Sequence, residues 1–78
     1  MKTRFGARLR GLRLSRGWSQ EAFASRVGLD RSYVGGVERG ERNISLENIC
    51  AMAAGLDVPA SELFAGWETG PKTKKPKL

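Results

Sequence analysis

Apolar residues recur along the chain at the three- and four-residue spacing of one helical face, and glycines separate the segments that show it. Phe5, Leu9 and Leu12 illustrate the spacing near the start. No stretch alternates apolar and polar residues over five positions, so we expect no strand and an all-α fold. The segments predicted to be helical, which would form a five-helix bundle, are 3–15, 20–27, 31–39, 46–55 and 60–64.

The boundaries of these helices carry residues that suit them. Ser19, Asp30 and Ser45 each precede a predicted helix, where a side-chain oxygen can accept hydrogen bonds from the first backbone amides. Pro59 suits the first turn of the last helix because its missing N–H costs nothing there. Local chemistry and apolar spacing therefore predict the same helices.

The segment 20–37 has the pattern of a helix-turn-helix, in which two helices of about eight residues are joined by a short turn. Ala24 is small where the two helices would touch. Gly28 lies where the chain must reverse, and positive φ is freely available only to glycine. The apolar side chains expected to pack the crossing are Phe23, Val27, Leu29, Val34 and Val37. The alternative is an ordinary helical hairpin within a bundle.

Composition narrows the class of protein. The chain has 78 residues, a hydrophobic fraction of 40% and a formal net charge of +6, so we expect one small basic domain. It has no histidine, a single cysteine and no glycine-rich phosphate loop, so we predict no enzyme activity, no metal and no cofactor. No apolar run approaches the ~20 residues that span a bilayer, and no signal-peptide pattern opens the chain. We therefore expect no membrane partner and a cytoplasmic location.

Basic residues gather at both ends of the chain. Residues 1–20 carry six of them and no acid, and residues 70–78 hold four lysines and two prolines. The end of the chain cannot pack a core, so we predict a folded domain over 1–67 and a disordered basic tail over 68–78. This tail would add non-specific attraction to DNA, or it has no role.

Three stretches resemble the lambda-repressor/Cro-type (XRE) helix-turn-helix family, namely SQEAFA at 19–24, VGLDRSYV at 27–34 and VERG at 37–40. Within that family, the chain is most similar to restriction–modification controller proteins at LDRSY (29–33), ER (38–39) and RN (42–43). The resemblance implies a five-helix lambda-repressor-like bundle and a sequence-specific DNA-binding transcriptional regulator that binds a two-fold symmetric operator as a dimer. An antitoxin, a phage-type repressor or a protein-binding module that does not read DNA are alternatives on the same fold.

The resemblance places the helix predicted over 31–39 in the major groove, where the residues at its start reach base edges. In this sequence these are Arg31, Ser32 and Tyr33. Arg31 offers two parallel N–H donors that match guanine O6 and N7. The alternative interpretation is that Arg31 is solvated or binds a phosphate. Tyr33 stacks on a base or sugar, or it packs partly into the core.

Contacts to DNA phosphates are expected from Gln20 at the start of its helix and from Arg39, Arg42 and Asn43 after the recognition helix. Gly35 and Gly36 remove side chains from the surface that enters the groove. They either let the backbone approach DNA closely, or they only fit the helix against its surroundings.

Two further roles follow from the resemblance. The family pairs the positions of Arg13 and Glu38 as an internal ion pair, so we assign Arg13 to structure rather than to DNA. In some family members an acidic residue at the position of Glu21 contacts RNA polymerase, and the resemblance implies the same role here. The alternative interpretation is that Glu21 is a solvated residue at the start of its helix.

A single reading helix makes few base contacts, so we expect a homodimer on double-stranded DNA. The last two predicted helices are rich in apolar residues that a domain of this size cannot all bury. Those expected at the dimer interface are Leu46, Ile49, Met52, Leu63, Phe64 and Trp67.

Overall fold

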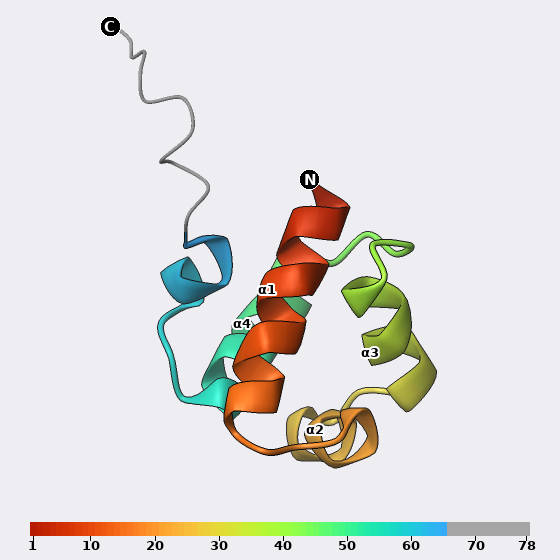
Figure 1. Ribbon diagram of the computed structural model, residues 1–78, viewed down its shortest axis with the longest axis vertical. Helices are drawn as coiled ribbons and strands as arrows, with labels where there is room; N and C mark the ends of the chain where they lie inside the picture. Colours follow the sequence, from red (N-terminus) through yellow and green to blue (C-terminus); the bar gives the residue numbers. More distant parts are fainter. Residues whose placement is uncertain (66–78) are drawn as a thin grey trace, which may run out of the picture.

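The computed structural model of the protein describes residues 1–65, which form four α-helices followed by one short 3₁₀ helix (Figure 1). No strand occurs among these residues, so the predicted all-α fold is confirmed for the described part of the chain. The predicted domain boundary and the predicted tail lie outside the described residues. The elements are α1 (Lys2–Ser15), α2 (Gln20–Val27), α3 (Arg31–Glu38), α4 (Leu46–Leu56) and η1 (Ala60–Phe64).

The prediction of five α-helices is wrong at the last element, which is a 3₁₀ helix. The amide of Glu62 donates to the carbonyl of Pro59 at 2.9 Å, and the amide of Ala65 donates to the carbonyl of Glu62 at 3.3 Å. Both bonds span three residues, the spacing of a 3₁₀ helix. Arg8 of α1 also donates from Nε to the Glu62 carbonyl at 2.7 Å, so a side chain holds this short turn in place.

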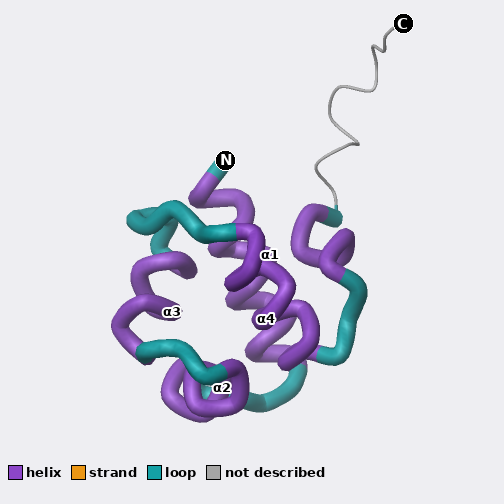
Figure 2. The backbone as a smooth tube through the Cα atoms, turned by 180° about the vertical axis from the view of Figure 1, so that it is seen from behind, coloured by secondary structure: helices purple, strands orange, loops and turns teal. Residues whose placement is uncertain are grey.

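One core joins all five elements. Helix α1 packs against α3 and η1, while α2 packs against α3 and α4, as Figure 2 shows from behind. Phe23 lies at the centre and is fully buried. The other apolar residues of the core are Phe5, Leu9, Ala24, Val34, Val37, Met52, Ala53, Leu56 and Leu63. Because Val34 and Val37 of α3 belong to this core, the core holds α3 in place against α1 and α2.

A close approach between α1 and α3 depends on Gly6. A Cβ atom added at Gly6 would overlap the carbonyl oxygens of Val37 and Glu38. Because these are backbone atoms, they cannot move aside as a flexible side chain would. A residue without a side chain is therefore needed for α3 to lie against α1 at this distance.

The helix-turn-helix predicted from the sequence is present in α2, α3 and the turn between them. Gly28 ends α2 with φ of 74°, in the left-handed region, and lets the chain reverse. The Asp30 side chain then accepts from the amide of Ser32 at 3.0 Å and caps α3. Ser19 and Ser45 cap α2 and α4 in the same way.

Candidate nucleic-acid interface

The start of α3 presents two exposed side chains, Arg31 and Ser32, beside the half-buried Tyr33. Arg31 forms no ion pair with any other described residue. The Ser32 hydroxyl donates to the carboxylate of Asp30. This hydrogen bond is the main reason that the pKa of Asp30 lies below its ordinary value, and the hydrogen bond from the Ser32 backbone amide is the second. The start of α3 is therefore capped by Asp30, and the exposed Arg31 is in no ion pair with another described residue.

Tyr33 connects α3 to the α3–α4 loop and to α4. Its hydroxyl accepts a hydrogen bond from the side-chain amide of Asn48 at 3.1 Å and lies 3.4 Å from the Asn43 carbonyl. The guanidinium of Arg42 stands over the ring, 5.6 Å from its centre. The sequence offered partial core packing and DNA contact as alternatives for Tyr33. The structure shows the packing contacts, and Asn48 is a partner that the sequence reasoning missed.

Two arginine side chains lie over the glycines of α3. A Cβ atom at Gly36 would come within 2.8 Å of Arg42 Cγ, and one at Gly35 within 3.1 Å of Arg39 Nη1. The glycines therefore leave room for the two arginines that follow the last residue of α3. This supports the reading in which Gly35 and Gly36 fit the helix against its own surroundings.

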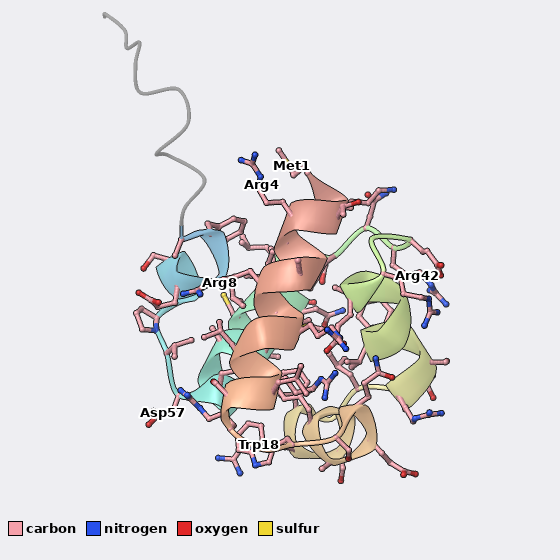
Figure 3. All side chains as sticks on the ribbon, viewed as in Figure 1. Met1, Arg4, Arg8, Trp18, Arg42 and Asp57 are labelled. Atoms are coloured by element: carbon pink, nitrogen blue, oxygen red, sulfur yellow. The ribbon has the colours of Figure 1, made fainter. Side chains whose placement is uncertain are left out.

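The three residues expected to contact phosphates after the recognition helix are Arg39, Arg42 and Asn43, and all three are exposed. The Arg39 Nε lies 3.1 Å from Glu41, in an ion pair whose two side chains are each 59% exposed. Such a pair contributes little in water, so phosphate can compete with Glu41 for Arg39. Figure 3 shows Arg42 at the outer side of α3.

A buried network lies behind this surface. Arg13 donates to the two carboxylate oxygens of Glu38, from Nε at 2.7 Å and from Nη2 at 3.0 Å. The Arg13 and Glu38 side chains are only 6% and 2% exposed. Arg13 also donates from Nη1 to the Trp18 carbonyl at 2.7 Å. The hydrogen bond with Glu38 raises the pKa of Arg13. The buried pair is the internal ion pair that the family resemblance implies.

Gln20 belongs to the same network. Its side-chain amide donates to Glu38 Oε1 at 3.0 Å, which links the first residue of α2 to the last residue of α3. The predicted phosphate contact of Gln20 therefore competes with an internal hydrogen bond that the sequence does not reveal. Glu21, the predicted polymerase contact, is exposed in the first turn of α2.

Several other arginines hold the fold together. Arg8 forms an ion pair with Glu62 at 2.8 Å. Arg16 and Arg26 donate to the carbonyls of Leu56 and Gly55 at the end of α4, at 3.0 and 2.8 Å. Cations at this end of a helix compensate its free carbonyls and its dipole. Together with Arg13, these arginines thus make contacts within the domain.

The residues predicted at a dimer interface divide into three groups. Leu46 is 76% exposed, while Ile49 and Phe64 are half-buried. Met52 and Leu63 are 0% exposed, so the prediction that they meet a partner is wrong, because the monomer core encloses them. Trp67 lies outside the described residues.

Residues 1–65 contain neither a membrane-spanning helix nor a cluster of metal-ligating side chains. Within residues 1–65, no helix combines the length and the apolar character needed to cross a bilayer. Over the same range, histidine, cysteine and acidic side chains nowhere gather in threes as a metal site would need.

Comparison with known proteins places this geometry among helix-turn-helix proteins. A family model described as helix-turn-helix matches residues 9–63. The control protein C.MunI of a Mycoplasma species is 45% identical over 69 residues, which cover 87% of this chain and 93% of that protein.

Two solved structures show the same arrangement. The controller protein C.AhdI from Aeromonas hydrophila superposes with a TM-score of 0.80 at 59% identity, covering 81% of this chain and 96% of that one. The controller protein C.Esp1396I, solved as a tetramer with its natural 35-base-pair operator, has a TM-score of 0.74 at 30% identity, covering 81% of this chain and 83% of that one.

Proposed function

The chain belongs to the helix-turn-helix family and resembles restriction–modification controller proteins over most of its length, and on this premise we propose that it is a sequence-specific DNA-binding transcriptional regulator of the controller type. It binds a two-fold symmetric operator as a dimer, because one short reading helix makes too few base contacts for specific recognition. The structure of C.Esp1396I with its operator supports this proposal by its likeness in fold and sequence.

One observation carries the proposal, namely the exposed and unpaired Arg31 at the start of α3, among the described residues. A major groove ~12 Å wide accepts one α-helix, and the residues at its start reach base edges. Arg31 donates two parallel hydrogen bonds to guanine O6 and N7, worth about 1–3 kcal/mol of discrimination against other bases. Ser32 and Tyr33 extend the reading surface along the same turn.

Phosphate contacts on the flank fix the register of the helix in the groove. Arg42 and Asn43 are exposed on the α3–α4 loop, and Arg39 precedes them at the end of α3. Such contacts release counterions from DNA, so operator affinity falls steeply as salt rises. We expect Arg42→Ala to reduce the slope of log affinity against log salt by about one.

Glu21 completes the proposal as the surface that contacts RNA polymerase when the protein is bound upstream of a promoter. It is exposed in the first turn of α2 and forms no ion pair with another described residue. Glu21→Gln should keep operator affinity and lose transcription activation. Full activation by this variant would remove the polymerase role.

The deciding experiment is binding-site selection from random double-stranded DNA with the purified full chain. We expect two-fold symmetric sites with half-sites one helical turn, ~34–36 Å, apart and a guanine opposite Arg31. Arg31→Ala should relax selection at that base. Arg31→Lys is the matched control, because it keeps the charge and loses the two-pronged donor. Selection that yields no common site would refute the proposed function.

A further inference from the structure

An apolar pocket of about 300 Å³ opens between the start of α1, the loop that joins α3 to α4, and η1. Its apolar walls come from Phe5, Ile44, Ile49 and Phe64, of which the last three are only half-buried. The volume lies at the lower end of the range of small-molecule sites in proteins, about 300–1,000 Å³. The pocket therefore has room for a small ligand.

The charge around the pocket favours an anion. Lys2 of α1 and Arg42 of the loop both line it, both are exposed, and neither forms an ion pair within residues 1–65. No aspartate or glutamate is found among the described residues that line the pocket. Two positive charges thus lie beside apolar walls without a carboxylate in the same place. A ligand with an apolar body and an anionic group complements this distribution.

Two features of the lining narrow the ligand to an aromatic carboxylate. The rings of Phe5 and Phe64 lie 5.5 Å apart between centroids, with their planes tilted by 52°. Aromatic groups favour such tilted contacts, and a ligand ring can extend this pair. The planar guanidinium of Arg42 matches a carboxylate, to which it donates two parallel N–H bonds.

We propose that this pocket binds a small aromatic carboxylate, whose rings pack against Phe64 and Ile49 and whose carboxylate accepts hydrogen bonds from Arg42 and Lys2. The walls supply apolar contact, and the two cations supply the selection for an anion. The site is separate from the start of α3, where Arg31 is expected to read bases.

The site also affects DNA binding, and this part of the inference rests on the proposed function. The guanidinium of Arg42 stands over the Tyr33 ring and is one of the proposed phosphate contacts. A ligand that holds this guanidinium removes it from the DNA backbone. The bound ligand therefore lowers operator affinity, and the operator lowers ligand affinity by the same factor.

Isothermal titration calorimetry of the full chain with 2-naphthoate, in the absence of DNA, tests the site. We expect saturable binding of one ligand per chain. The matched control ligand is 2-naphthamide, which has the same rings and a neutral head group and should bind about tenfold more weakly or worse. Absence of saturable binding, or equal affinity for the two ligands, would overturn the inference.

A pair of charge reversals on α1 then assigns the binding to the pocket. Lys2→Glu should weaken 2-naphthoate binding about tenfold or more, because an anion replaces a donor at the site. Arg10→Glu makes the same change at an exposed residue that does not line the pocket, and should alter the affinity less than about threefold. Thermal unfolding of both variants checks that they fold. An equal loss in the two would overturn the assignment.

A second copy of the chain is the competing occupant, because Ile49 and Phe64 are also expected at the dimer interface. If a second copy filled the pocket, the affinity for 2-naphthoate would fall as chain concentration rises, and that result would overturn the ligand site. We expect an affinity that does not depend on chain concentration. Backbone amide chemical shifts should change at Ile44 and Ile49 and not at Gly17, beyond the other end of α1. Changes that leave out Ile44 and Ile49 would also overturn it.

Operator affinity measured with and without 2-naphthoate tests the coupling. Saturating ligand should lower the affinity of the wild type about fivefold or more. The effect should be less than about twofold in Arg42→Ala, which has already lost the shared side chain. An operator affinity that ignores bound 2-naphthoate would overturn the coupling.

These outcomes separate the inference from the proposed function. Binding of 2-naphthoate by a chain without sequence-specific DNA binding would keep the ligand site and reject the proposed function. Sequence-specific DNA binding by a chain that does not bind 2-naphthoate would keep the proposed function and reject the ligand site.

Discussion

Replacing Glu38 with alanine removes a carboxylate on which three helices converge. It accepts two hydrogen bonds from Arg13 of α1, at 2.7 and 3.0 Å, and one from Gln20 of α2, at 3.0 Å. The Arg13 side chain is only 6% exposed, so its charge would remain buried without a partner. Breaking one side of such a pair costs about 3–5 kcal/mol.

That cost is large for a domain of this size. At roughly 0.05–0.15 kcal/mol per residue, the described 65 residues have a total stability of roughly 3–10 kcal/mol. Glu38→Ala should therefore remove from about a third to all of the free energy of unfolding. Urea denaturation followed by far-ultraviolet circular dichroism measures this loss directly.

A matched control comes from an exposed ion pair, Arg39 with Glu41. Glu41→Ala removes the partner of Arg39, where both side chains are 59% exposed, and should cost less than about 1 kcal/mol. Exchanging the buried pair for Arg13→Met with Glu38→Leu should recover much of the loss, because no unpaired charge remains. A loss below about 1 kcal/mol for Glu38→Ala would refute this reasoning.

Three further outcomes follow from single positions. Gly6→Ala should destabilise the fold by about 1–3 kcal/mol in urea denaturation, since its Cβ meets the backbone of α3, whereas Gly11→Ala, with open space around it, should not destabilise it. Asp30→Asn should lower stability above about pH 4 and match the wild type in stronger acid, since the native pKa of Asp30 is depressed and the contribution of its carboxylate is lost as pH falls through that pKa. Asp57→Asn should raise the unfolding free energy by about 0.3–1 kcal/mol, because it removes a negative charge from the end of α4 while asparagine keeps the φ of 61° accessible.

Local signals explain why the helix-turn-helix could be predicted. Ser19 and Asp30 cap their helices through side chains that lie three and two residues from the bonded amide, and Gly28 reverses the chain by its own conformational freedom. None of these contacts depends on a distant part of the chain. Sequence patterns therefore locate α2, the turn and the start of α3.

Contacts between elements account for what the sequence did not show. Gln20 bonds to Glu38 and Tyr33 bonds to Asn48, partners that lie 18 and 15 residues away and carry no local signature. The last element has helical spacing, yet it forms a 3₁₀ helix, and its Glu62 carbonyl accepts a hydrogen bond from Arg8, 54 residues away.

Burial along α4 was difficult to predict for a different reason. Leu46, Ile49 and Met52 are all apolar and follow at three-residue intervals, so their spacing does not show where the buried face ends. The packing of α2 and η1 against α4 decides this, and it encloses Met52 while leaving Leu46 outside.

The arrangement of Arg39 and Arg42 over Gly35 and Gly36 has a consequence for altering target preference. Any side chain introduced at either glycine must push an arginine to a new position before it can reach DNA itself. Under the proposed function, each such substitution in α3 therefore also moves an arginine that is proposed to contact DNA. A library that varies 35 and 36 together with 39 and 42 would then search the available specificities more completely than one confined to the helix.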